Sequence, residues 1–361
     1  MRFRYIFGTA LSVVAASASA QSSVTLYGVV DVNMRYVKNS DLPSNTTMAT
    51  GGLSSGRLGF RGIEDLGGGL KAGLVLEGDV TAHTGTTSPN DRLFSRRSTV
   101  SLLGSLGELR LGRDLSPASA HSYVYDPFGV VGLGGSNVTS RIGRVLNTYY
   151  RSDNSVQYMT PNFGGFHADF MYALDERVGD NAGRHAAARL KYDKGPIGAS
   201  LSYGTTRLPG ATATTPRLQT GDDYTSLGVG LSYDFGFAKL YGHFFRDELP
   251  LGIYTVGSTT TLAGSENRWL LGVTVPVGVH YIRASYVALD SRDGTAEYNE
   301  ADASKFAIGY VHNLSKRTAL YGTAAYVNNK GRAAFSLPGA TPGLAEGGNS
   351  TGFETGIRHL F

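Results

Sequence analysis

Residues that could take part in chemistry are spread along the whole of this 361-residue chain. Eight histidines occur, but no His-Glu-x-x-His sequence and no close pair points to a bound metal. Cysteine is absent, which excludes disulfides and cysteine metal sites. Serine, histidine and aspartate are all present, as chance alone would place them. We therefore predict neither catalysis nor a cofactor.

Arginines show a clearer pattern. In Arg57-Leu58-Gly59-Phe60-Arg61, an extended backbone places Arg57 and Arg61 on one face and Leu58 and Phe60 on the other. Such a segment suits a strand with water on one side and an apolar medium on the other. We expect both arginines to face water.

Alternating segments of about ten residues recur along the chain, and we count sixteen. In one of them, Phe306, Ile308 and Tyr310 share a face opposite Lys305 and Gly309. Glycine (49 residues) and tyrosine (21) are abundant, which favours strands and tight turns over packed helices. Beyond the N-terminal region no apolar run approaches the length of a transmembrane helix. A membrane protein of this kind must be a β-barrel.

Short and long connections alternate along the chain. The short ones, rich in Gly, Pro, Asp and Asn, are 65–69, 104–107, 160–165, 193–196, 234–236, 276–278 and 313–316. The long ones are 39–53, 83–91, 114–147, 176–184, 206–222, 248–265, 290–302 and 330–349. This segregation is typical of an outer-membrane barrel and has no reason to occur in a soluble sandwich. We predict an all-β fold, a 16-stranded antiparallel transmembrane β-barrel.

Both ends of the chain agree with export to an outer membrane. Arg2 and Arg4 precede an apolar run that ends in Ala18-Ser19-Ala20, which predicts a signal peptide over residues 1–20, cleaved before the barrel of residues 21–361. An apolar run of about 12 residues is too short for a spanning helix, which needs about 20. The last strand ends on Phe361, where an aromatic would anchor barrel closure and assembly at the membrane interface.

The connection 114–147 is the longest, and it is longer than ordinary geometry requires. It contains Asp126-Pro127-Phe128-Gly129 and a glycine-rich stretch. A sixteen-stranded barrel has a bore wide enough for an aqueous channel, so we expect this loop to fold inward as a constriction. The alternative is a surface loop.

The charge balance argues against nucleic acid as a partner. Lys and Arg number 33 against 29 Asp and Glu, a net charge of +4. No basic run or clustered stripe accompanies this small excess.

Several blocks resemble the general porins of Gram-negative bacteria, particularly those of betaproteobacteria. These blocks follow the family's order over the whole mature chain. They are Ser23 to Asp31, Arg57 to Ala72, Phe94-Ser95-Arg96 with Leu111-Gly112-Arg113, Asn154 to Tyr158, Leu314 to Thr318 and Gly356 to Phe361.

The resemblance implies a basic cluster on the barrel wall facing acidic groups of the constriction loop. Arg57 and Arg96 match two of the arginines, and Arg61 shares the face of Arg57. The third is best matched by Arg144, with Arg141 and Arg151 as alternatives. The acidic side would be Asp114 and Asp126, and Asp126 stands where relatives often carry a glutamate-containing motif.

The resemblance also implies a homotrimer in the cell outer membrane, in contact with outer-membrane lipid and lipopolysaccharide. Its function would be passive diffusion of small hydrophilic solutes and ions through a water-filled channel. With more arginines than carboxylates at the constriction, we expect a weak preference for anions. The alternatives are a channel specific for a sugar or an organic anion, and an outer-membrane hydrolase.

Overall fold

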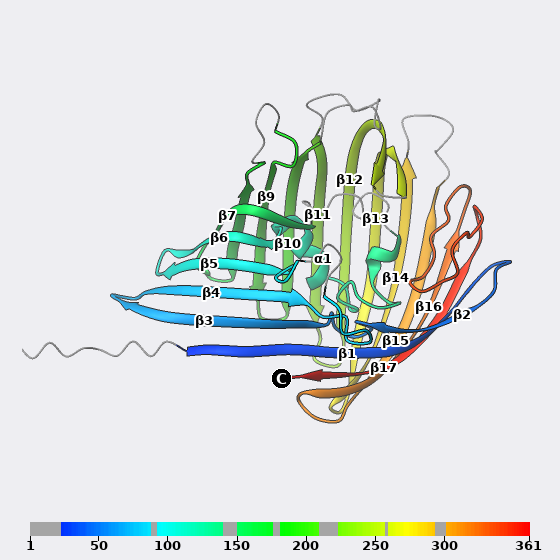
Figure 1. The fold of residues 1–361 in the computed structure, drawn as a ribbon, viewed down its shortest axis with the longest axis horizontal. Coiled ribbons are helices and arrows are strands. Elements are labelled where there is room, and N and C mark those ends of the chain that lie inside the picture. Colours follow the sequence, from blue (N-terminus) through cyan, green and yellow to red (C-terminus); the bar gives the residue numbers. More distant parts are fainter. Residues whose placement is uncertain are drawn as a thin grey trace, which may run out of the picture.

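The computed structural model describes residues 23–87, 92–139, 150–175, 181–208, 223–256, 259–292 and 301–361, with side chains left out over 250–263 (Figure 1). The signal peptide predicted over residues 1–20 lies outside these ranges. The strands are β1 (Ser23–Asn39), β2 (Asn45–Thr50), β3 (Arg57–Gly67), β4 (Leu70–Asp79), β5 (Arg97–Gly104), β6 (Gly107–Leu115), β7 (Arg151–Met159), β8 (Phe166–Ala173), β9 (His185–Lys194), β10 (Ile197–Arg207), β11 (Asp223–Asp234), β12 (Lys239–Val256), β13 (Thr259–Val277), β14 (His280–Arg292), β15 (Ala303–Asn313), β16 (Thr318–Asn329) and β17 (Ser350–Leu360).

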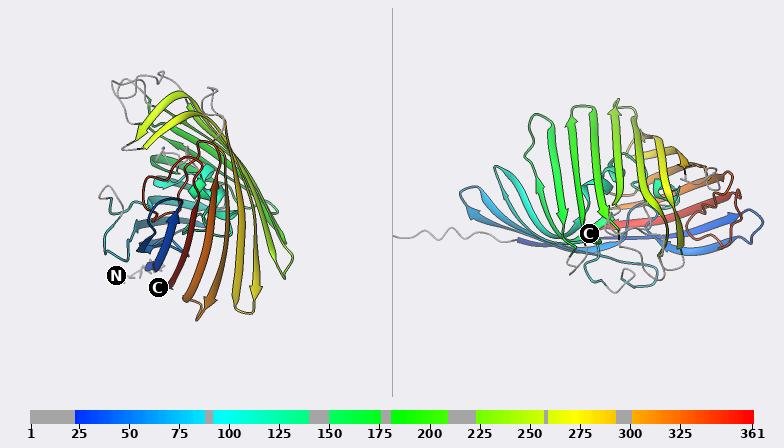
Figure 2. Two further views of the ribbon diagram at one scale, coloured as in Figure 1. Left: turned by 90° about the vertical axis from the view of Figure 1, so that its right-hand side faces the viewer. Right: turned by 90° about the horizontal axis from the view of Figure 1, so that it is seen from above.

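The strands form one closed antiparallel barrel. Apart from β2 and β3, which both pair with β1, each strand pairs with its neighbours in chain order, and β17 returns to pair with β1 from Val29↔Leu360 to Asn39↔Ser350. Figure 2 shows the sheet curling round until these two strands lie side by side. On its other edge β1 pairs with β3 along its first half and with β2 along its second. Since β2 and β3 are two parts of one barrel strand, the described segments confirm the predicted sixteen strands.

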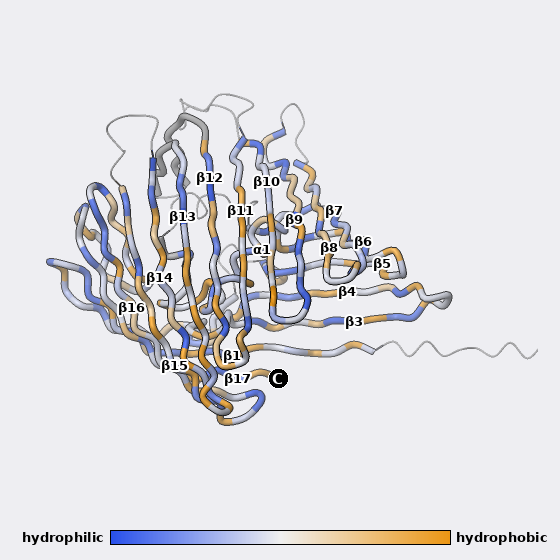
Figure 3. Tube along the Cα trace, turned by 180° about the vertical axis from the view of Figure 1, so that it is seen from behind, coloured by the Kyte–Doolittle hydropathy of each residue, from blue (hydrophilic) through white to orange (hydrophobic). Residues whose placement is uncertain are grey.

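The two faces of the strands differ as the alternation predicts. Phe306, Ile308 and Tyr310 are 41–49 % exposed on the outer face, whereas Lys305 and Ala307 are buried on the inner face. Figure 3 shows polar and apolar residues alternating along the strands. No helix within the described residues has the length and apolar character to cross a membrane.

The short turns lie where they were predicted, but two long connections differ. Residues 45–50 of the predicted connection 39–53 form β2, which leaves a break at 51–56 inside the second barrel strand. Most of the predicted connection 248–265 is strand, because β12 and β13 keep pairing as far as Val256↔Thr259. The β-branched run that begins at Thr259 favours this extension.

The loop after β6 lies inside the barrel. Its helix α1 (Pro117–Val124) packs against the inner face of β8 to β11, and a 3₁₀ helix, η1 (Ser136–Thr139), follows near β14 and β15. Between them the loop reaches β17, where the Leu133 N–H donates to Glu354. The described part of the predicted loop, up to Thr139, therefore confirms the inward fold.

The last residue joins the ends of the barrel. The Phe361 N–H donates to the Gly28 carbonyl at 3.2 Å, and the Gly28 N–H donates to the Phe361 carbonyl at 3.0 Å. The Phe361 ring fills the space that a Cβ at Gly28 would need. The terminal aromatic is thus paired with β1 beyond the last residue of β17.

Deleting Phe361 is expected to lower the yield of folded, heat-modifiable protein severalfold. The deletion removes two backbone hydrogen bonds, each worth about 1 kcal/mol, and the interface aromatic at the barrel junction. Unheated gel electrophoresis measures the yield, with Leu314→Ala in an exposed turn as the control. A wild-type yield of the Phe361 deletion variant would show that Phe361 is not needed for assembly.

Candidate pore constriction

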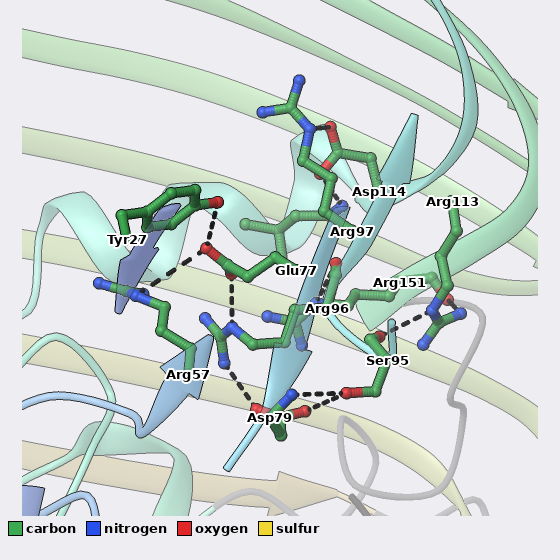
Figure 4. Close-up of polar contacts among 11 residues, drawn as sticks. Tyr27, Arg57, Glu77, Asp79, Ser95, Arg96, Arg97, Arg113, Asp114 and Arg151 are labelled. Carbon is green, nitrogen blue, oxygen red and sulfur yellow. Dashed lines mark hydrogen bonds and ion pairs between the residues drawn. The ribbon is translucent and has the colours of Figure 1, made fainter. Parts of the chain in front are cut away.

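Arginines of neighbouring strands meet on the inner wall opposite α1 (Figure 4). Arg57 on β3 is the direct partner of Asp79 on β4, and Arg97 on β5 is the direct partner of Glu77 on β4. Because directly paired residues point to the same face, β4 brings two carboxylates between two arginines. Arg96 immediately precedes β5.

Glu77 and Asp79 hold the arginines predicted from the sequence. Arg96 Nε lies 2.6 Å from Glu77 Oε1, and Arg96 Nη1 lies 2.9 Å from Asp79 Oδ1. Arg57 Nε is 3.9 Å from Glu77 Oε2, and the Tyr27 hydroxyl donates to the same oxygen at 3.0 Å. The structure therefore brings Arg57 and Arg96 together through one shared carboxylate.

Arg151, one of the alternatives for the third arginine, completes this group. Its Nε donates to the Arg96 carbonyl at 3.0 Å, and its guanidinium lies 4.6 Å from the centre of the Tyr150 ring. The Tyr123 ring of α1 lies 6.0 Å from the Tyr150 ring, and burial raises the pKa of the Tyr123 hydroxyl still further above neutral pH. The loop thus faces this arginine with an aromatic side chain. Arg141 and Arg144 lie outside the described residues.

The two acidic residues named from the sequence do not face the arginines from the loop. Asp114 is on the wall itself, where its Oδ2 is 3.3 Å from Arg97 and 2.6 Å from Arg110. Asp126 is buried in the loop, where its carboxylate accepts the N–H groups of Phe128 at 2.8 Å and Ser136 at 2.8 Å. Neither carboxylate faces the arginines from the opposite side. Asp126 instead holds the loop in shape, as an acceptor of backbone N–H groups.

Arg61 lies on the inner-wall side of β3, nearer the β3–β4 turn than Arg57. No ion pair joins it to another of the described residues. Arg61 therefore adds a positive charge to the wall beside the cluster, but it is not part of the hydrogen-bonded network of the cluster.

Among the described residues, the cluster carries more arginines than carboxylates. It extends through Arg113 and Arg92, which both contact Asp153. Its arginines are Arg57, Arg92, Arg96, Arg97, Arg110, Arg113 and Arg151. Its carboxylates are Glu77, Asp79, Glu108, Asp114 and Asp153. Sequence reasoning missed Glu77 and Asp79, although alternation along residues 70–79 puts both on one face.

One stretch has the spacing of a hydrolase nucleophile motif. Residues 52–56 read Gly-Leu-Ser-Ser-Gly, but they lie between β2 and β3, whereas a nucleophile elbow joins a strand to a helix. The Leu53 and Ser54 N–H groups donate to the Asp31 carboxylate, so this break is bound to the wall. The motif therefore gives no support to a hydrolase.

Uncharged histidines hold α1 against the wall. His121 Nδ1 lies 2.6 Å from the Ser200 hydroxyl, and His185 Nε2 lies 2.8 Å from the Ser116 hydroxyl that caps α1. His121 is completely buried, and this burial lowers its pKa to about 4. Protonation of His121 therefore opposes docking of the loop.

We expect docking of α1 to weaken as the pH falls from about 6.5, the ordinary histidine pKa, toward 4, with a total loss of roughly 3 kcal/mol. In the undocked loop His121 binds a proton in this range, and in the docked loop it does not. Above pH 6.5 His121 is mostly uncharged in the undocked loop as well, so its protonation no longer opposes docking. Single-channel current noise should rise in acid for wild type but less for His121→Asn, with exposed His83→Asn as the control. Equal acid noise in wild type and His121→Asn would contradict the assignment.

Comparison with known proteins finds similar proteins in one family. The profile of the Gram-negative porin family matches residues 8–332. The chain is 41 % identical to outer membrane porin protein 32 of Delftia acidovorans, over 98 % of both chains. It is 30 % identical to an outer membrane porin protein of Bordetella pertussis, over 96 % of both.

Solved structures agree with these relatives. An anion-selective porin from Comamonas acidovorans superposes with a TM-score of 0.79 at 37 % identity, covering 94 % of this chain and 100 % of its own. A trimer form of OmpT from Vibrio cholerae superposes with a TM-score of 0.63 at 15 % identity, over 94 % and 99 % of the two chains, which shows a shared fold.

Proposed function

Since this chain belongs to the Gram-negative porin family and is an outer-membrane porin, we propose that it is a general diffusion channel with a weak preference for anions. The observation that carries the preference is the excess of arginine over carboxylate on the wall opposite α1. The proposed constriction consists of Arg57, Arg96 and Arg151 on the wall and Tyr123 on the loop, with Arg61 beside them.

Carboxylates neutralise the charges of two of these arginines only weakly, so these charges can act on solutes. Arg57 is 3.9 Å from a carboxylate that also binds Arg96, and Arg151 has no ion pair among the described residues. In a narrow aqueous passage, excess fixed positive charge raises the local concentration of anions. The effect weakens as salt shortens the Debye length, which is about 10 Å at 0.1 M. The anion selectivity of the Comamonas porin named above supports the same sign here.

We propose a homotrimer, in line with the trimer form of OmpT among the structural neighbours. Export by a signal peptide of residues 1–20 and contact with lipid and lipopolysaccharide remain part of this proposal. We propose no enzymatic activity, and the relatives named above are porins. Mass spectrometry of the mature chain and unheated gels test the processing and the trimer.

Liposome swelling with sugars of graded size separates a general pore from a specific one. A general pore should admit sugars by size alone, because its constriction is lined by charge and a few aromatics rather than a continuous aromatic track. Saturation by one sugar, with exclusion of others of equal size, would favour the substrate-specific alternative. Isotonic sorbitol against a series from pentose to trisaccharide provides the comparison.

A further inference from the structure

Glu354 lies where the barrel closes. It is on β17, and its direct partner across the junction with β1 is Arg35. Glu354 Oε2 accepts hydrogen bonds from Arg35 Nε at 3.1 Å and from Arg35 Nη2 at 2.8 Å. Glu354 is completely buried and Arg35 is 6 % exposed. A charge-assisted pair with two hydrogen bonds therefore joins the first and last strands.

The other carboxylate oxygen of Glu354 reaches the loop. Oε1 accepts the Leu133 N–H at 2.9 Å. Gly132 has a φ of +63°, and a Cβ there would overlap both this carboxylate and the Gly52 carbonyl. The backbone of the loop thus approaches the wall too closely for any residue but glycine.

Several contacts hold the loop around Leu133 in place. Leu133 is buried in an apolar cluster with Val37 and Leu337. Lys305 Nζ donates to the Gly135 carbonyl at 2.6 Å. Asp126 binds N–H groups on both sides of this stretch, so a displacement at Leu133 also moves the residues that lead back to α1.

We propose that Glu354 is a positioning residue for the pore constriction, which fixes the loop at Leu133 to the junction of the first and last strands. The loop then takes its final place only on a closed barrel, because the carboxylate that binds it is oriented by Arg35 from the opposite side of the junction. This inference rests on the proposed role of the loop as the constriction.

Glu354→Ala tests the proposal, with Asp247→Ala as the matched control. Asp247 is as deeply buried, accepts the Tyr224 hydroxyl and lies 3.7 Å from Arg268, and neither a hydrogen bond nor an ion pair joins it to the described part of the loop. Both variants lose a buried carboxylate and should lose thermal stability. Only Glu354→Ala should raise single-channel conductance, by roughly half, and admit larger sugars. Leu133→Pro, which removes the donor N–H and leaves the Arg35–Glu354 pair, should do the same.

A disulfide provides the rescue within one molecule. A Cβ at Gly352 would lie 3.0 Å from Leu133 Cδ1, and the chain has no cysteine of its own. In Glu354→Ala with Leu133→Cys and Gly352→Cys, oxidation should restore the wild-type size limit and reduction should abolish it.

The proposal is overturned if assembled Glu354→Ala and Leu133→Pro both keep wild-type conductance and size limit, or if the triple variant keeps its enlarged size limit after mass spectrometry shows that the disulfide has formed. A wild-type channel without any size limit for sugars would instead contradict the proposed function.

Discussion

Replacing Arg57 and Arg151 together by serine is expected to shift the reversal potential of the channel toward cation preference at low salt. These two arginines have the weakest carboxylate partners in the cluster, whereas Arg96 remains to satisfy Glu77 and Asp79. A charge about 6 Å away in water changes the energy of an ion by about 0.7 kcal/mol, or roughly threefold in local concentration. The double variant should therefore change the local anion concentration roughly tenfold.

Arg246→Ser with Arg292→Ser is the control for net charge. Both are exposed, and both lie on the outward face of their strands, which carries Phe244 on β12 and Tyr286 on β14. This variant should keep the wild-type reversal potential. If the two double variants shift the potential equally, the selectivity does not arise at the wall opposite α1.

Deleting Val130 to Ser136 should raise both the conductance and the size limit for sugars while leaving the proposed trimer intact. The deleted stretch carries the Leu133 and Gly135 contacts that hold the loop across the lumen. The strand pairs that close the barrel, by contrast, involve no loop residue. The conductance should rise roughly in proportion to the cross-section that is freed.

Planar-bilayer recording and liposome swelling measure the effect of the deletion, with Val131→Ala as a control that keeps the length and the anchors of the loop. Wild-type conductance and size limit in a correctly assembled deletion variant would show that this stretch does not narrow the channel.

Strands and turns could be predicted from the sequence because their signals are local. A period of two along each segment identifies the lipid face, and glycine-rich punctuation marks the turns. Strand β2, and with it the break at 51–56, was missed because the cause is not local. Asp31 on β1 binds the Leu53 and Ser54 N–H groups, and that contact depends on the neighbouring strand.

The site was predictable on the barrel wall and not in the loop. Arg57 could be named because the alternation along its strand fixes where it points, in agreement with the family resemblance, whereas Arg96, which precedes β5, could be named from the resemblance alone. Asp126 could not be assigned from its position in the loop, since its carboxylate turns inward to backbone N–H groups that only the folded loop brings together. Arg151 stood among three candidates until its contact with Arg96 placed it in the cluster.

The reversal potential of the wild-type channel in a potassium chloride gradient tests the central claim most directly. If the loop narrows a lumen that carries excess arginine, the sign of the reversal potential should show a preference for chloride. This preference should decline as the mean salt concentration is raised from about 0.01 M to 1 M, because the Debye length falls from about 30 Å to 3 Å. A preference for potassium, or a chloride preference that is the same at both concentrations, would contradict it.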